Sequence, residues 1–312
     1  MTLTLVAGTA NPALAAAVAE RVGGRLAEAA VGSFPDGELH VEVQENVRGH
    51  DVYLLQPTAP PVERHLLELL LLADACRRAG AARISAVVPY FGYARQDRRA
   101  SAREAVGARV VADLFATRGF ARIVALDLHA GALEGFFSCP LEHLTAVPVL
   151  VEALREERRA NGVVVAPDMG AAKLAERYAK ALHLPVAVVL KARRSGAEVE
   201  VHGITGDVRD RAPLVVDDMI STAATVTAAV TALIAAGCEP EVTVAATHGL
   251  FVGPALGRLA ALRLRRLVVT DSVAVPEPQP IALHIASVAP LLADAVSRLH
   301  QERPLGDLLA RE

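Results

Sequence analysis

Short aliphatic runs alternate with longer segments of helical periodicity along the whole chain. The run at 39–43 alternates apolar and polar side chains with period two, which is the pattern of a half-buried strand. On this basis we predict strands at 2–6, 39–43, 52–56, 84–89, 122–128, 162–166, 185–190, 198–202, 214–216, 241–247 and 265–270. Helices are predicted at 12–23, 60–79, 103–117, 147–160, 171–183, 226–236, 253–262 and 288–300. This alternation predicts an α/β fold with mainly parallel sheets and helices on both faces.

The alternation restarts near residue 145, which indicates two domains. A chain of 312 residues also exceeds the roughly 250–300 residues at which a single hydrophobic core stops growing. We therefore predict an N-terminal domain over 1–145 and a C-terminal domain over 146–294. The last helix is expected to pack back across this boundary, so that the segment 295–312 joins the N-terminal domain.

The composition narrows the class of protein. Hydrophobic residues make up 53% of the chain and charged residues 21%, which is typical of a globular protein without disordered regions. The net charge of -3 gives no reason to expect a nucleic-acid partner or a polybasic membrane contact. Cys76, Cys139 and Cys238 are far apart in sequence and fit reduced thiols of a cytoplasmic protein.

No membrane segment or signal peptide is expected either. The N-terminus lacks a basic region. The stretch 219–238 is uncharged and near membrane-spanning length, but it is rich in Ala and Thr and directly follows two aspartates. A soluble helix explains it better.

The stretch 214–227 carries the strongest chemical signal. A short apolar strand ends in Asp217 and Asp218, and a loop of small and hydroxyl residues then leads into a helix. The loop amides and the helix N-terminus offer a phosphate site, while Thr222 and Thr225 can cap the helix or donate hydroxyls to phosphate. The carboxylates would repel phosphate, but they suit a sugar phosphate whose vicinal hydroxyls need acceptors. An ordinary capped helix beside a surface pair of aspartates is the alternative.

Other charged residues also follow predicted strands. The segment 90–99 mixes aromatic and charged side chains, which suits a loop that stacks a base and neutralises phosphates, although composition alone favours a solvated face. A single histidine such as His129 is more often structural than a ligand. In parallel sheets, however, ligands bind beyond the carboxyl ends of strands. Five residues fall at such ends: Arg95, His129, Asp168, Lys191 and Asp217.

Taken together, the motifs resemble the ribose-phosphate pyrophosphokinase family. The stretch 214–227 by itself resembles the 5-phosphoribosyl-binding loop of phosphoribosyltransferases. The turn signal at 34–38 is explained equally well by a simple turn, but it also matches a family motif. The motifs occur in the family's order at 10–12, 34–38, 89–98, 127–131, 167–168, 191–193, 217–220 and 247–249.

The resemblance implies two tandem phosphoribosyltransferase-like domains with the active site between them. It implies transfer of the diphosphate of ATP to the 1-hydroxyl of ribose 5-phosphate, with Mg²⁺ as cofactor and AMP as the second product. A neighbouring subunit would help to form the ATP site. The resemblance therefore also implies a homo-oligomer built from dimers, up to a hexamer.

The resemblance assigns the ATP site to the N-terminal domain. Phe34 would stack on adenine, and Asp36 and Glu38 would hold the base and its subunit contact. Arg95 and Gln96 would bind the nucleotide and its phosphates, with Asp97 in the same ATP-binding segment.

The remaining roles follow from the same resemblance. His129 and Asp168 would position Mg²⁺, and Asp217 and Asp218 would hold the ribose hydroxyls. Lys191 and Arg193, on a loop expected to be mobile, would close over the transferring diphosphate. The 5-phosphate would lie on Ser221, Thr222, Ala223, Ala224 and Thr225.

The chain departs from the usual family pattern at a few positions. Ser221 replaces the third aspartate of the commonest bacterial loop, and Ala224 stands where glycine is usual. If that position needs a positive φ, an alanine costs roughly 1 kcal/mol. Met169 stands where the family often has histidine, and Ala100 and Ala105 also differ. These departures bear on affinity, regulation and activity rather than on the fold.

Two other functions are considered. One is a catalytically weak, synthetase-associated regulatory paralogue, which Ala224 would favour. The other is a phosphoribosyltransferase, which shares the sugar-phosphate loop. Such enzymes usually have one domain of this kind, and that function leaves the motifs at 34–38 and 95–98 unexplained.

Overall fold

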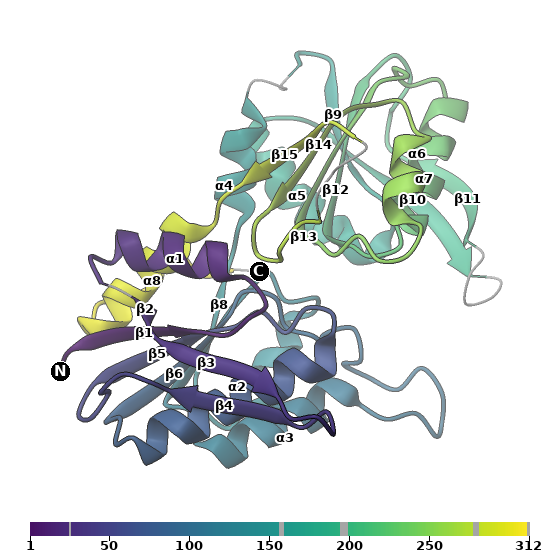
Figure 1. Ribbon diagram of the computed structural model, residues 1–312. Coiled ribbons are helices and arrows are strands. Elements are labelled where there is room, and N and C mark those ends of the chain that lie inside the picture. The colour runs from purple at the N-terminus through teal and green to yellow at the C-terminus, as the bar shows by residue number, and fades with distance from the viewer. Residues whose placement is uncertain (25, 156–158, 194–198, 277–280, 311–312) are drawn as a thin grey trace. The chain divides into compact units, whose positions relative to one another are not determined.

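The chain forms two compact units. The computed structural model describes residues 1–24, 26–155, 159–193, 199–276 and 281–310, with backbone alone for 192–193 and 199–201 (Figure 1). The first unit contains Met1–Thr145, Ser272–Ala274 and the C-terminal segment from Val288 onward. The second contains Ala146–Asp271 and Val275–Ser287. The C-terminal segment grouped with the first unit thus begins at Val288, whereas the sequence pattern placed its start at 295.

The first unit is built on a six-stranded parallel sheet of order β2-β1-β5-β6-β7-β8. Helices α1 (Pro12–Arg21) and α8 (Ala289–His300) pack on each other over one face, and α2 (Val62–Arg78) and α3 (Gly107–Arg118) cover the other (Figure 1). The strands are β1 (Leu3–Ala7), β2 (Leu26–Ala27), β5 (Asp51–Leu55), β6 (Arg83–Val88), β7 (Arg122–Leu126) and β8 (Leu141–Leu144). Strands β2 and β8 were not predicted, because runs this short carry no clear period.

Local sequence explains where these elements begin. Asn11 accepts a hydrogen bond from the Leu14 N–H, and Pro12 occupies the first turn, so α1 starts with both a cap and a residue of fixed φ. Strand β5 is buried along its whole length, as expected for an interior parallel strand. Leu54 on β5 and Phe115 on α3 belong to one hydrophobic core under the sheet.

A separate antiparallel hairpin lies beside this sheet. Strand β3 (Ala29–Ser33) pairs with β4 (Leu39–Val43), and β4 packs on α2. The bounds predicted for β4 are confirmed, whereas β3 was not predicted. The turn between the two strands carries residues 34–38.

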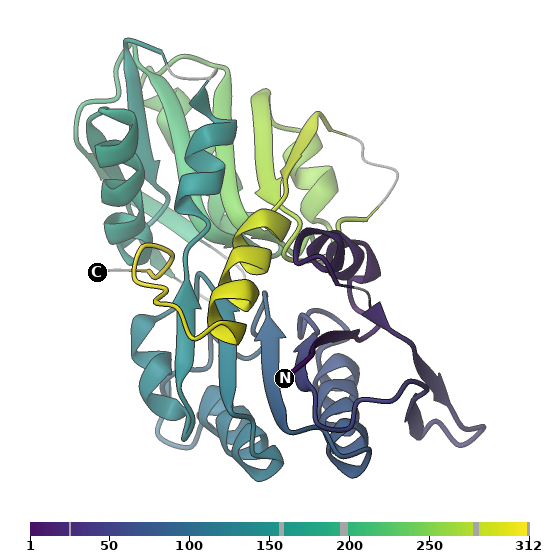
Figure 2. The same ribbon diagram turned by 90° about the vertical axis from the view of Figure 1, so that its left-hand side faces the viewer.

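The C-terminal segment is fastened to the first unit at two places. The buried Asp51 carboxylate accepts two hydrogen bonds from Arg83, at 2.7 and 2.6 Å, and lies 2.8 Å from Nδ1 of His300 at the end of α8. Burial alone would raise the pKa of Asp51, but these hydrogen bonds outweigh it and hold the pKa below its usual value. Beyond α8, shown in yellow in Figure 2, Leu309 pairs with Leu144 of β8.

The second unit is built on a seven-stranded sheet of order β11-β10-β9-β12-β13-β14-β15. Every recorded pair is parallel except β10 with β11. The strands are β9 (Gly162–Ala166), β10 (Val186–Arg193), β11 (Val199–Thr205), β12 (Ala212–Ile220), β13 (Val242–Gly249), β14 (Leu264–Thr270) and β15 (Leu283–Ala286). Helices α4 (Val147–Ala153) and α5 (Ala172–Leu182) pack together, as do α6 (Ala224–Ala235) and α7 (Ala255–Ala260).

Four strands of the second unit, β10, β11, β12 and β13, run past their predicted ends, and β12 and β10 carry candidate site residues. Strand β12 was expected to end at 216, but Asp217, Met219 and Ile220 continue its pairing with β13. Strand β10 was expected to end at 190, but its antiparallel pairing with β11 extends it to Arg193. Asp217 and Lys191, which were read as following strand ends, therefore lie on the strands themselves. Helix α3 begins at Gly107, later than the predicted 103, because turns occupy the residues before it.

The architecture confirms the predicted α/β class, with two domains that each have a mostly parallel sheet flanked by helices. In the part of the chain that the structure describes, no helix is both long and apolar enough to cross a membrane. The uncharged stretch at 219–238 instead contains the end of β12, a loop and α6.

Candidate active site

The loop between β12 and α6 presents an uncapped helix N-terminus. Ala223 has the left-handed conformation, with φ 61° and ψ 9°, and α6 begins at the next residue, Ala224. No side chain caps α6 in the structure as described, so its first N–H groups are available to an anion. The positive φ anticipated at Ala224 therefore falls at Ala223, and Ala224 is an ordinary first helical residue.

The hydroxyl residues of the loop do not cap the helix. Thr222 is exposed, and its carbonyl oxygen accepts a hydrogen bond from Arg258 at 3.0 Å. Ser221 contributes its carbonyl oxygen to the Val252 N–H at 3.0 Å. Arg258, from α7, was not identified from the sequence, because a lone arginine on a short helix gives no signal there.

Lys191 contacts both the start of α6 and Asp168, which follows β9. It lies on β10 and not on a loop, which corrects the prediction. Its Nζ is 2.5 Å from Oδ2 of Asp168 and donates to Oγ1 of Thr225 at 3.2 Å. The Lys191 side chain is only 10% exposed, so this ammonium is largely shielded from water. The structure thus brings together Lys191 and Asp168, which the sequence placed at separate strand ends, and Thr225 in the first turn of α6.

Asp168 is held on both oxygens. It follows β9, and its Oδ1 accepts hydrogen bonds from the Gly170 and Ala171 N–H groups at 2.9 and 3.2 Å. These bonds cap the short 3₁₀ helix η3 (Met169–Ala171) and fix the carboxylate, while Oδ2 faces Lys191. Met169 itself is 65% exposed and takes no part in this contact.

Asp217 and Asp218 form a closely spaced acidic pair on β12. Both are partly exposed, and the Asp218 N–H donates to Oδ1 of Asp217 at 2.9 Å. Burial raises the pKa of Asp217 well above its usual value, and the negative charges of Asp218 and Asp168 raise it further. Hydroxyl donors or a cation placed here would relieve this accumulation of charge.

The donor set of the second unit suits a hard cation. Carboxylate oxygens are the ligands that Mg²⁺ prefers, and Mg²⁺ keeps several waters, so few protein ligands suffice. Among the residues that the structure describes, no three His, Cys, Asp or Glu side chains are already grouped around a metal centre. Asp168 and the pair Asp217 and Asp218 therefore offer carboxylate oxygens to Mg²⁺ without forming a preassembled metal centre.

In the first unit, the turn of the β3–β4 hairpin presents an aromatic ring. Phe34 is 49% exposed and packs edge-to-face with His40, with ring centroids 5.2 Å apart. The turn closes through a hydrogen bond from the Phe34 N–H to the Glu38 carbonyl and one from the Glu38 N–H to Asp36, at 2.8 and 3.1 Å. The turn predicted from the sequence is therefore present, and it leaves the ring accessible.

The segment after β6 keeps its arginine in solvent. Arg95 is exposed, whereas Gln96 is tied to the turn, with its N–H donating to the Tyr93 carbonyl at 2.8 Å and its carbonyl accepting from the Ala108 N–H at 3.2 Å. Asp97 lies 3.8 Å from Arg98. Strand β6 is the parallel neighbour of β7, so this segment and His129 leave the same edge of the sheet.

His129 is exposed and follows a strained turn. Asp127, directly after β7, is buried and has φ 36°. The backbone therefore leaves the strand in a conformation that L-residues rarely adopt, although Asp tolerates it better than most. Arg193 ends β10, and its side chain lies outside the described residues.

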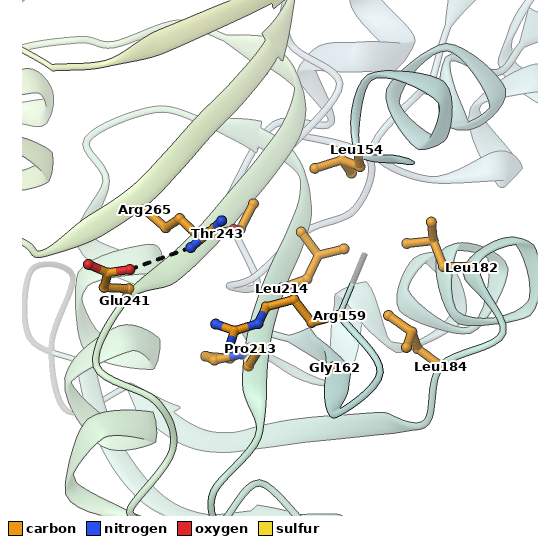
Figure 3. A pocket seen from close by; sticks show the side chains of 11 residues that line it. Leu154, Arg159, Gly162, Leu182, Leu184, Pro213, Leu214, Glu241, Thr243 and Arg265 are labelled. Carbon is orange, nitrogen blue, oxygen red and sulfur yellow. Dashed lines mark ion pairs between the residues drawn. The ribbon is translucent and has the colours of Figure 1, made fainter. Parts of the chain in front are cut away.

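A small hollow at the opposite edge of the second sheet, away from the residues described above, is not a candidate site. It lies at the start of β9 and β12 and is lined by Leu154, Leu182, Leu184 and Leu214, with Arg265 paired to Glu241 at 3.6 Å (Figure 3). Its volume is about 20 Å³, which has room for one water molecule.

Known families match both units. The N-terminal domain of ribose phosphate pyrophosphokinase matches residues 3–119, and the phosphoribosyl transferase domain matches residues 143–253. A ribose-phosphate pyrophosphokinase of Caldanaerobacter subterraneus is 42% identical over 301 residues, which cover 96% of this chain and 95% of that protein. The enzyme of the same name from Bacillus subtilis is 40% identical over 301 residues, with the same two coverages.

A solved structure agrees with these matches. The phosphoribosylpyrophosphate synthetase of Mycobacterium smegmatis superposes with a TM-score of 0.90 at 37% identity, covering 97% of this chain and 100% of that one. The fold and the two matching family models define a protein with phosphoribosyltransferase-like domains, as predicted. The chain belongs to the ribose-phosphate pyrophosphokinase family.

Proposed function

We propose that this chain is a ribose-phosphate diphosphokinase, which transfers the diphosphate of ATP to the 1-hydroxyl of ribose 5-phosphate and releases AMP. The observation that carries the proposal is the convergence of Lys191, Asp168 and Thr225 beside the acidic pair of β12. Family membership supports the reaction, because the relatives bear that name along nearly their whole length.

Ribose 5-phosphate is proposed to bind along β12 and the start of α6. The uncapped N-terminus of α6, together with the hydroxyls of Ser221, Thr222 and Thr225, would hold the 5-phosphate, since amides and the helix dipole favour an anion there. The small side chains of Ala223 and Ala224 leave the backbone accessible. Asp217 and Asp218 would accept hydrogen bonds from the vicinal ribose hydroxyls, which the charge crowding at Asp217 favours.

The reaction itself needs positioning and charge neutralisation more than covalent chemistry. The anomeric hydroxyl attacks the β-phosphorus in line, so the protein must align the two substrates and stabilise the negative charge that builds up. Asp168 in the second unit and His129 in the first are proposed to position Mg²⁺. When bound, Mg²⁺ would neutralise phosphate oxygens and orient the diphosphate.

Lys191 is proposed to stabilise the transferring diphosphate. Its ammonium is desolvated and already lies between the carboxylate proposed for the metal and a hydroxyl of the phosphate loop. To reach the diphosphate, it would exchange its bond to Asp168 for phosphate oxygens. Arg193, two positions along on the same strand, is proposed to assist it.

ATP is proposed to bind through residues of the first unit. Phe34, with its exposed ring, would stack on adenine, and Asp36 and Glu38 would hold the base. Arg95, Gln96 and Asp97 would bind the phosphates and the rest of the nucleotide. A neighbouring subunit is proposed to complete the ATP site beside the exposed Phe34 ring, in a dimer-based homo-oligomer of up to a hexamer. A cytoplasmic location, with neither nucleic acid nor membrane as a partner, remains part of the proposal.

The test is product analysis. Purified protein with ATP, ribose 5-phosphate and Mg²⁺ is expected to form AMP and phosphoribosyl diphosphate in equal amounts. Formation of a nucleotide from a free base and phosphoribosyl diphosphate would instead favour a phosphoribosyltransferase. If no product forms, with or without added phosphate, the regulatory function gains support, and binding to an active synthetase subunit would be measured next. The positive φ of the loop falls at Ala223, so strain at Ala224 itself gives no support to this last alternative.

A further inference from the structure

Strand β8 holds the turn that carries His129. The Asp127 N–H donates to the Leu144 carbonyl at 2.9 Å, and the Leu128 N–H donates to Nε2 of His143 at 2.8 Å. Both acceptors are adjacent residues of β8. The left-handed Asp127 lies between β7 and these contacts, so the turn is fixed against relaxation by its neighbouring strand.

The hydrogen bond to Leu128 determines the protonation of His143. A backbone N–H can only donate, so Nε2 of His143 must be unprotonated and accept. The neutral imidazole then carries its proton on Nδ1 and donates it to Oε1 of Glu134, 3.1 Å away on the 3₁₀ helix η1 (Gly131–Phe136). The carboxylate thus selects the tautomer that the turn needs, as carboxylates do for metal-bound histidines.

Burial makes this acceptor hard to replace. His143 and Leu128 are each 9% exposed, so water has little access to the Leu128 N–H if the imidazole is lost. A buried backbone donor without a partner is strongly disfavoured. The turn would then shift to satisfy it, and His129 would shift with the turn.

We propose that His143 and Glu134 are a positioning pair, which fixes residues 127–129 and thereby the orientation in which His129 is presented. Neither residue is proposed to touch substrate. The structural part of the inference stands by itself, and only its effect on catalysis rests on the proposed function. When the pair is broken, the enzyme should need a higher Mg²⁺ concentration and have a lower kcat/KM for Mg·ATP. The inference predicts no change at the ribose 5-phosphate site, whose proposed residues all lie in the second unit.

The test compares His143→Leu with His143→Gln. Leucine removes the acceptor, whereas the glutamine Oε1 can occupy about the place of Nε2 and accept from Leu128. We expect His143→Leu to lower kcat/KM for Mg·ATP about 10- to 100-fold, the usual effect of losing an outer partner of a metal site, with KM for ribose 5-phosphate unchanged. His143→Gln should recover most of this loss. Glu142→Gln, one residue away on β8, loses the charge of its ion pair with Arg122 but keeps His143, so it controls for a general loosening of β8 and should keep the wild-type kcat/KM for Mg·ATP.

A spectroscopic measurement covers the case in which His143→Leu does not fold. In imidazole ¹⁵N spectra of the full chain, His143 should carry its proton on Nδ1 in the wild type. The same tautomer of His143 is expected in Glu134→Gln, because the glutamine oxygen can still accept. Glu134→Lys replaces the acceptor with a donor, so it should reduce the Nδ1–H form.

Either of two results overturns the inference. One is a wild-type His143 protonated on Nε2, and the other is a folded His143→Leu with wild-type kcat, Mg²⁺ dependence and KM for ATP. If the wild type itself makes no phosphoribosyl diphosphate, the proposed function fails, and the tautomer measurement alone decides the inference.

Discussion

Replacing Lys191 with alanine is expected to abolish most turnover while leaving ribose 5-phosphate binding intact. The Nζ lies 2.5 Å from Asp168 and 3.2 Å from the Thr225 hydroxyl on a side chain that is 10% exposed. A charge this shielded acts in an effective dielectric of about 20, where a unit charge 4 Å away contributes about 4 kcal/mol. Loss of one donor aimed at developing charge costs about 2.7–4 kcal/mol by analogy with oxyanion sites.

These magnitudes set the expected effect on rate. At about 1.36 kcal/mol per factor of ten, Lys191→Ala should lower kcat by about 100- to 1,000-fold. Steady-state formation of AMP gives kcat, and isothermal titration calorimetry gives the affinity for ribose 5-phosphate, which should stay close to wild type because the amides of α6 remain. Lys180→Ala, an exposed lysine on α5 of the same unit, is the matched control.

The same variant tests the contact with Asp168. Because Nζ occupies Oδ2 of that carboxylate, removing the ammonium frees an oxygen for a cation. Mn²⁺, followed by electron paramagnetic resonance, should therefore bind substrate-free Lys191→Ala more tightly than wild type. Near-normal turnover of the variant, or loss of ribose 5-phosphate binding together with turnover, would refute the role given to Lys191.

Three further predictions concern stability, measured by thermal and urea unfolding. Ala223→Gly should raise the free energy of unfolding by about 1 kcal/mol, because it removes a positive φ from a residue with a Cβ; a destabilised variant would contradict this. Asp217→Asn should stabilise the substrate-free protein, whereas the control Glu176→Gln should not. Because the pKa of Asp217 is raised in the folded protein, the stabilisation by Asp217→Asn should grow as pH rises above 4 and be absent in acid. A stabilisation that does not depend on pH would contradict the charge crowding at Asp217. Arg83→Leu should lower the free energy of unfolding by about 3 kcal/mol by leaving Asp51 buried without its main partner. Because the pKa of Asp51 is lowered in the folded protein, that loss should be larger at pH 7 than below pH 3, and an equal loss at both would refute the cause.

Apolar runs with a clear period were predictable from the sequence. The bounds of β4 and β9 are confirmed at Leu39–Val43 and Gly162–Ala166, since each is a short run with sharp ends. Strand β8 was missed because its sequence, Leu-Glu-His-Leu, is too short to show a period and has two polar residues. The polar residue His143 of β8 is explained by its hydrogen bonds with Leu128 and Glu134, which no sequence pattern encodes.

At the candidate site, the errors have one physical cause. Charged residues were read as the ends of strands, yet Asp217 and Lys191 lie on strands whose backbone pairing continues past them. The polar side chains of Asp217 and Lys191 serve contacts with neighbouring polar groups, while their backbone groups remain in the sheet. That these residues gather at one edge was predictable from the rule for parallel sheets. The particular contact between Lys191 and Asp168 depends on the register between strands and could not be predicted.

The positive φ at Ala223 shows the same limit. The sequence raised a positive φ only as a condition at Ala224, and the conformation of the turn places it at the adjacent Ala223. The roles given to individual site residues stay predictions, since they rest on the family resemblance together with the contacts described above.

The most direct test of the central claim follows the label of ATP carrying ³²P at the γ-position. The protein is incubated with this ATP, ribose 5-phosphate and Mg²⁺, and the products are separated. If the diphosphate is transferred intact, the label appears in phosphoribosyl diphosphate in an amount equal to the AMP formed. Label in inorganic phosphate, or ADP in place of AMP, would contradict the proposed transfer.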